Sequence, residues 1–282
     1  MKLKHTAVWV GFTAAALLTV SACGAQTTKK AADVAETAQS RIMAALSRAT
    51  DQTQNLGSAE VRMSTDLGNG RAPVTAEGTY SWGKGFAFDV EMDTKAAQMQ
   101  QVHAAPKTRM IFLGGAYYYD IDPQPSGPLK GKEWMKVDAS ALFGDKGAQA
   151  LNGSSGAGSP SASMRGLKYA NDVDDLGTET VDGQRAHHYK AVIDRAHMGR
   201  FKEAYGDDDS LFGSMTGGVD SITMDVWVNG KDLPVRMKQQ LGRATVTMDF
   251  EKFGATATVT APPAAQTGDL TDAIKARQQQ QG

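Results

Sequence analysis

The stretch "SITMDVWVNGKDLPVRMKQQLGRATVTMDFEKFG", residues 221–254, decides the fold class. Apolar residues alternate with polar ones in three consecutive runs, and short turns rich in Gly, Asn and Asp separate the runs. A period of two places successive side chains on opposite faces of a strand. Short polar turns of this kind connect neighbouring antiparallel strands. We therefore predict three consecutive antiparallel strands with one apolar face and one hydrated face.

The alternation assigns the large apolar side chains of this stretch to a common face. Several of them are methionines, which adapt their shape more readily than branched side chains do. The residues assigned to this face are Ile222, Met224, Val226, Val228, Val235, Met237, Leu241, Val246, Met248 and Phe250.

The same period appears earlier, between residues 58 and 138. Met63 lies in the first of these runs, and "RMIFLGGAYYYDID" (109–122) predicts a hairpin that turns at Gly114 and Gly115. Strands separated by short turns, each with one apolar face, indicate an antiparallel meander. In "GFAFDVEMD" (85–93) the apolar face carries Phe86, Phe88, Val90 and Met92.

A helical period precedes the strands. Between residues 33 and 55, Ile42, Met43, Leu46 and Ala49 recur at steps of three and four, which predicts an amphipathic helix.

The middle of the chain is less regular, and we expect short elements there. The predictions are short helices in "ASALFG" (139–144) and "GAQALN" (147–152), a loop over 151–163, a hairpin about Asp182 and Gly183, a helix over 194–206 and a loop over 206–218. After residue 254, "ATATVTAPP" is expected to be a last strand that ends at Pro262 and Pro263.

These elements predict an α+β fold with a single large curved antiparallel β-sheet, a half-barrel, and helices packed on its concave face. The strands form one domain, because no Pro-rich or charged linker divides them. We expect a signal peptide over 1–22, a lipidated tether over 23–33, one domain over 34–265 and a flexible tail over 266–282.

The N-terminus has the pattern of a secretory signal peptide. Lys2, Lys4 and His5 are basic, and the uncharged run 6–20 that follows is shorter than the ~20 residues of a spanning helix. The run Val20-Ser21-Ala22-Cys23-Gly24 resembles the lipobox of bacterial lipoproteins. This resemblance implies cleavage before Cys23 and a covalent diacylglycerol and N-acyl group, of the palmitate type, on Cys23.

The sole cysteine of the chain is Cys23, and an exported fold that needed disulfides would show an even set. A plain signal peptide followed by an incidental cysteine remains the alternative. With the anchor, the protein would reside at the extracytoplasmic face of the cell membrane.

Composition and motifs argue against other classes of protein. The net charge of −1 and the 22% of charged residues give no basic footprint for nucleic acid. The adjacent His187 and His188 point to opposite faces of a strand and cannot share a metal ion, and His103 and His197 stand alone. No nucleophile, phosphate-binding or metal motif is present, so we expect neither an enzyme nor a metal cofactor.

The methionines on the predicted apolar faces suggest a surface that adapts to an apolar ligand, although simple filling of the core explains them as well. A sheet that is only partly covered by helices would leave apolar volume for a ligand. The candidate lining residues are Met43, Leu46, Met63, Phe86, Phe88, Val90, Met92, Ile222, Met224, Val226, Met237, Met248 and Phe250.

Several segments together resemble the actinobacterial LppX/LprA/LprF/LprG-type lipoproteins, which are similar in fold to the LolA/LolB lipoprotein carriers. They are "ETVDGQRAHHYKAVID" (179–194), "ITMDVWVNGKDLPVRM" (222–237) and "TMDFEKFGATATVTAPP" (247–263), which follow the lipobox and helix in this order. The stretches 153–163 and 206–218 depart from the family pattern as local expansions. The resemblance implies a half-barrel whose apolar cavity holds the acyl chains of a lipid, lipoglycan or lipoprotein.

The leading hypothesis is therefore a membrane-anchored lipoprotein that carries or presents such a molecule in the cell envelope, with a membrane transporter or another envelope protein as a further partner. The alternative is an envelope sensor or accessory module with a packed interior that binds a protein partner. An apolar cavity between the sheet and its helices would favour the lipid carrier. An interior that is fully packed with side chains would favour the sensor or accessory module.

Overall fold

The structure is a computed structural model that describes residues 24–152, 159–170, 172–194, 196, 220–254 and 256–279. The chain forms two compact units, Met1–Ala38 and Gln39–Gly282. Within the first unit, the described residues belong to helix α1 (Gly24–Leu56), so the expected tether is helical from Gly24 onward. The expected signal peptide, Cys23, His197, the loop 206–218 and all of the helix 194–206 except residues 194 and 196 lie outside the described residues.

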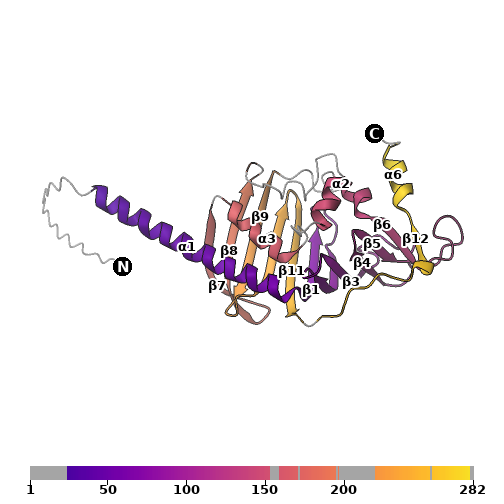
Figure 1. Ribbon diagram of the computed structural model, residues 1–282, viewed down its shortest axis with the longest axis horizontal. Coiled ribbons are helices and arrows are strands. Elements are labelled where there is room, and N and C mark those ends of the chain that lie inside the picture. The colour runs from indigo at the N-terminus through magenta and orange to yellow at the C-terminus, as the bar shows by residue number, and fades with distance from the viewer. Residues whose placement is uncertain are drawn as a thin grey trace, which may run out of the picture. The chain divides into compact units, whose positions relative to one another are not determined.

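A single open sheet of 12 strands forms most of the second unit (Figure 1), which confirms the predicted fold class. Its order is β12-β6-β5-β4-β3-β2-β1-β11-β10-β9-β8-β7, and every pairing is antiparallel except the parallel one between β12 and β6. The strands are β1 (Ser58–Asp66), β2 (Val74–Ser81), β3 (Ala87–Asp93), β4 (Lys107–Leu113), β5 (Ala116–Asp120), β6 (Trp134–Asp138), β7 (Val173–Val181), β8 (Gln184–Asp194), β9 (Ser221–Asn229), β10 (Pro234–Leu241), β11 (Ala244–Phe253) and β12 (Thr267–Asp269).

Two meanders make up the sheet, one from β1 to β6 and the other from β7 to β11. The predicted hairpins are confirmed: β4 and β5 turn at Gly114 and Gly115, whose φ angles are 60° and 82°, and β7 and β8 turn at Asp182 and Gly183. Two consecutive residues with positive φ match the twist of paired strands. The meanders meet in the middle of the sheet, where β1 pairs with β11.

The helices lie on one face of the sheet, which we call the inner face (Figure 1). They are the later part of α1, α2 (Ala139–Asn152), α3 (Pro160–Gly166) and the 3-10 turn η1 (Leu167–Tyr169). Trp82 Nε1 donates to the carbonyl oxygen of Thr53 at 2.9 Å, which fixes α1 against the end of β2. Ser161 Oγ donates to Gln54 Oε1 at 2.7 Å and joins α3 to α1.

The opposite, outer face is hydrated and carries cross-strand ion pairs. Arg62 on β1 reaches Glu77 on β2 at 2.9 Å and Glu251 on β11 at 2.7 Å. Arg236 on β10 likewise pairs with Asp249 on β11. Such charges keep much of this face in water, so most of the apolar surface of the sheet is buried on the inner face.

The stretch 151–163, expected as a loop, is partly helical. Ser159 accepts a hydrogen bond from the backbone N–H of Ala162 at 3.1 Å, and Pro160 begins α3. A serine cap followed by proline is a helix-start signal that the sequence contains. The short helices predicted on either side of Gly144 are confirmed, since α2 breaks at this residue.

The end of the chain also differs from expectation. Residues 256–263 form no strand, because β11 already pairs with β1 on one side and β10 on the other. The chain instead crosses to the far edge and adds β12 beside β6, followed by α6 (Thr271–Gln279). Residues 266–279, expected as part of a flexible tail, thus contain regular structure.

Asp269 of β12 is held by hydrogen bonds with Lys136 and Thr271. Burial by itself raises the pKa of Asp269, but these hydrogen bonds bring this pKa below its ordinary value.

Gly78 allows β2 and β3 to approach each other closely, because glycine has no Cβ atom. A Cβ atom at Gly78 would lie 2.2 Å from the carbonyl oxygen of Asp89 and 2.9 Å from Val90 Cα. We expect Gly78→Ala to lower the free energy of unfolding by about 1–3 kcal/mol, measured by urea denaturation. Gly230→Ala is the control, because its Cβ meets nothing within 4 Å. Equal stability of the two variants would contradict the role of Gly78.

Candidate functional site

The inner face is the candidate site, because the sheet gathers its apolar side chains there. The sequence-predicted lining residues come together: twelve of the set belong to one contiguous apolar cluster, and Ile222, which is 1% exposed, follows the same alternation on β9. The twelve are Met43, Leu46, Met63, Phe86, Phe88, Val90, Met92, Met224, Val226, Met237, Met248 and Phe250.

Val235, which the alternation assigned to this face but not to the predicted lining, does not join them. Val235 falls at a bulge in β10 and packs on the outer face with Trp227, Val181 and Ala186. A bulge inserts one extra residue and changes the facing of its neighbours. The alternation in the sequence could not show it.

Aromatic rings occupy the half of the inner face formed by β2 to β5. Phe112, which is fully buried, has its ring centroid 4.8 Å from that of Tyr117, 5.6 Å from that of Phe88 and 5.4 Å from that of Phe86. Tyr80 stacks on Phe88 at 5.1 Å. These close ring contacts form a rigid block, since aromatic pairs hold preferred geometries.

The other half, formed by β8 to β11, is rich in methionine and valine and also carries the rings of Tyr189, Phe250 and Phe253. Met237 lies between Val226 of β9 and Met248 of β11, and Met248 lies beside Met63 of β1. Unbranched thioethers fill irregular space and rearrange at little cost. This half is therefore the more adaptable part of the inner face.

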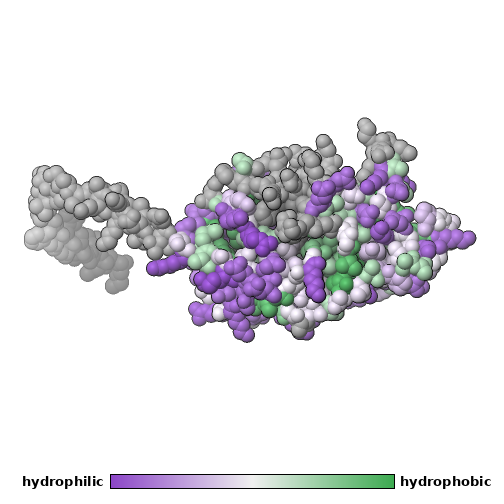
Figure 2. Space-filling model, in the orientation of Figure 1, coloured by the Kyte–Doolittle hydropathy of each residue, from purple (hydrophilic) through white to green (hydrophobic). Residues whose placement is uncertain are grey.

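A strip of half-buried residues crosses four adjacent strands where the two halves meet. Along the strand register, Gln239 of β10 is beside Val246 of β11, Val246 is beside Thr65 of β1, and Thr65 is beside Val74 of β2. Met63 and Met248, one pair further along, are also half-buried. We call Met63, Thr65, Val74, Gln239, Val246 and Met248 the open strip. Figure 2, viewed from the helix-bearing side, shows apolar residues at the surface between hydrophilic ones.

The described residues of the apolar cluster are uncharged, and the Asp175–His187 contact lies on the same face at the β7–β8 edge. Burial raises the pKa of Tyr80 and Tyr117 far above the ordinary range and that of Tyr119 to about 12, so all three phenols stay neutral. Tyr80 Oη donates to Met63 Sδ at 3.6 Å. The three hydroxyl groups therefore place a few neutral polar atoms within the apolar face.

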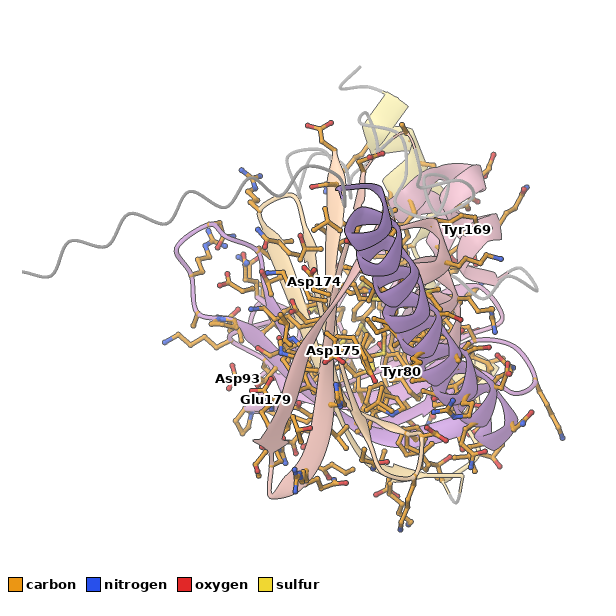
Figure 3. The ribbon with its side chains drawn as sticks, turned by 90° about the vertical axis from the view of Figure 1, so that its left-hand side faces the viewer. Tyr80, Asp93, Tyr169, Asp174, Asp175 and Glu179 are labelled. Carbon is orange, nitrogen blue, oxygen red and sulfur yellow. The ribbon has the colours of Figure 1, made fainter. Side chains whose placement is uncertain are left out.

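The histidines that the structure describes form no shared site. His188 lies on the outer face with Nδ1 2.7 Å from Glu179 and Nε2 2.8 Å from Asp225, whereas His187 contacts Asp175. Asp175 and Glu179 follow one another along the edge strand β7 in Figure 3. Among the described residues, no group of three His, Cys, Asp or Glu side chains could hold a metal ion. His103 is buried in the β3–β4 connection, where its Nε2 lies 3.0 Å from the carbonyl oxygen of Lys107 and its Nδ1 lies 3.5 Å from Asp122 Oδ1.

The architecture defines a class of fold, an open antiparallel sheet with helices over its apolar face. Among solved structures, the lipoprotein LppX of Mycobacterium tuberculosis has this fold: the TM-score is 0.50 at 14% identity, over 78% of this chain and 98% of that one. The LppX-type fold expected from the sequence is thus confirmed.

In sequence, the chain is similar to two Streptomyces proteins. It is 24% identical over 246 residues to a Streptomyces coelicolor protein named as a lipoprotein (SCO4650), across 82% of this chain and 75% of that protein. It is 23% identical over 247 residues to an uncharacterized 31.2 kDa protein of Streptomyces griseus, across 83% of this chain and 80% of that protein. No protein-family model matches the chain.

Sequence reasoning found Phe86 and Phe88 of the aromatic half but missed Tyr80, Phe112, the inward-facing tyrosines and Gln239. Three consecutive tyrosines, 117–119, hide which of them faces inward, so Tyr117 and Tyr119 could not be assigned. Gln239 carried a signal, because it replaces an apolar residue in the alternation between Met237 and Leu241.

Proposed function

We propose that this protein is a membrane-anchored, extracytoplasmic lipoprotein that binds the acyl chains of a lipid, lipoglycan or lipoprotein on its inner face. It carries or presents the bound molecule in the cell envelope. The observation that supports this most is the open strip, a half-buried region that crosses a broad apolar face. The LppX-type fold and the similarity to a protein named as a lipoprotein are consistent with it.

Apolar area that the open strip leaves partly exposed would stabilise a bound acyl chain. Each Å² of apolar surface removed from water contributes about 25 cal/mol, so acyl chains laid on the strip would gain from burial. The methionines on either side can rearrange around chains of different length. The polar head of the ligand would stay in water at the rim of the sheet. This activity is carriage, which requires no chemical step.

The anchor is the second part of the proposal, and it rests on Cys23. No described helix is both long and apolar enough to cross a membrane. Two or more acyl chains on Cys23 would hold the protein at the bilayer, since each buried methylene contributes ~0.8 kcal/mol.

A charge in the open strip should remove bound lipid. We expect Met248→Glu to lower the amount of lipid that co-purifies by at least about tenfold, because burying an unpaired carboxylate beside acyl chains is costly. The chain 24–282, which keeps every described residue, would be purified without detergent and its bound lipid measured by mass spectrometry.

Thr247→Glu is the matched control, since Thr247 is the neighbour of Met248 but lies on the outer face beside Lys238. It should keep the wild-type amount of lipid. A wild-type protein free of lipid, with a crosslinked protein partner instead, would favour the sensor or accessory module and overturn the proposal.

A further inference from the structure

Gln239 is a polar residue in apolar surroundings. Across the strands it lies between Met224 of β9 and Val246 of β11, and along β10 the next residues on the same face are Met237 and Leu241. A residue with this register belongs to the inner face, where alternation alone would favour an apolar side chain.

The amide nitrogen of Gln239 lacks a hydrogen-bond partner. This atom, Nε2, is buried and makes no hydrogen bond. Buried polar groups are nearly always paired, so an unpaired donor needs an explanation. Two other buried side-chain atoms in the described chain make no hydrogen bond, Thr94 Oγ1 and His103 Nδ1; both belong to the β3–β4 connection, and His103 Nδ1 lies 3.5 Å from Asp122. Gln239 is therefore the orphan donor on the inner face.

We infer that Gln239 Nε2 donates a hydrogen bond to the carbonyl oxygen of an acyl ester in the bound lipid. This inference rests on the proposed function and names the ligand class: lipids whose chains are joined by esters, in preference to ether-linked lipids. An ester carbonyl accepts a hydrogen bond, and the ether linkage has no carbonyl group to offer.

The position suits such a contact. Gln239 lies at the β10 end of the open strip, whose other end is Val74 on β2. Neighbouring strands are ~4.8 Å apart, so three spacings give the strip a width of about 14 Å. A chain that starts at a carbonyl held by Gln239 would cross Val246 and Thr65 and pass the methionine pair Met248 and Met63. The ester carbonyl is the one polar group of such an acyl chain, and this path places it beside the Gln239 donor.

The test compares two lipids that differ only in the linkage. The chain 24–282 would be titrated with dioleoyl phosphatidylglycerol and with the dialkyl ether lipid of the same headgroup and chain length. We expect wild type to bind the ester lipid roughly 2- to 10-fold more tightly, the range for one hydrogen bond. Gln239→Leu should bind the two lipids with equal affinity. Its affinity for the ester lipid should fall, while its affinity for the ether lipid should stay at the wild-type value.

Gln240→Leu is the matched control, because Gln240 is the next residue and is exposed on the outer face. It should keep the ester preference. Gln239→Met, which has similar length and no donor, repeats the test in case Gln239→Leu fails to fold, as judged by circular dichroism.

The outcomes separate the inference from the function on which it rests. Equal binding of both lipids by wild type, or an ester preference that survives in Gln239→Leu and Gln239→Met, would overturn the role of Gln239 and leave lipid carriage intact. Binding of neither lipid by wild type would overturn both.

Discussion

Replacing Cys23 with alanine is expected to move the protein from the membrane fraction to the soluble fraction, or to leave the precursor unprocessed. In the proposed mature protein, the acyl chains on the Cys23 sulfur and amino group are the only attachment to the bilayer. Two signals or chains give stable anchoring, whereas a single one gives marginal binding. Without the thiol no thioether can form, so the partition into membranes should fall by orders of magnitude.

Cell fractionation followed by immunoblotting measures this effect, and intact-mass spectrometry of the wild type reports the covalent lipid. Gln26→Ala keeps the thiol and serves as the control, with normal processing and anchoring expected. Circular dichroism should show the same fold in both variants, because every described strand lies after residue 57. A Cys23→Ala protein that is processed normally and stays in carbonate-washed membranes would refute the lipid anchor.

Phe112→Ala is expected to have the largest effect on stability. The ring is 0% exposed and contacts three other aromatic rings, those of Phe86, Phe88 and Tyr117. Truncating a buried phenylalanine to alanine costs about 3–5 kcal/mol, a large part of the 5–15 kcal/mol that stabilises a typical domain. Urea denaturation followed by tryptophan fluorescence measures the change.

Leu176→Ala on β7 provides the comparison, since this leucine is 54% exposed and its truncation should change stability by less than about 0.5 kcal/mol. If Phe112→Ala lost no more stability than Leu176→Ala, the aromatic half could not be the rigid block described above.

Local features of the fold were predictable from the sequence because they depend on neighbouring residues. Alternation placed Met224, Val226 and Met237 on one face, and the structure brings them together. Paired turn residues such as Gly114 and Gly115 located a hairpin. The candidate lining was found in the same way, because residues on one face of consecutive strands must gather. Whether it holds lipid is a prediction that the titrations address.

Non-local features were not predictable. The strand expected over 255–263 failed because its place was already taken: β11 has neighbours on both sides. The alternation around Val235 cannot show a bulge, which depends on the partner strand. Gln239 stood out only as a break in a pattern, and its unpaired amide became visible once Met224 and Val246 were placed beside it.

The pairing of β1 with β11 also determines how the chain can fold. Its partners are far apart in sequence, as the 189-residue separation of Arg62 and Glu251 shows. Each meander can form from contacts between consecutive strands, but the central seam cannot close until nearly the whole chain is available. Folds dominated by such distant contacts form slowly, because the entropy of closing a long loop must be overcome first. Until the seam closes, both meanders present unpaired strand edges, and this interval is when the molecule is most exposed to aggregation.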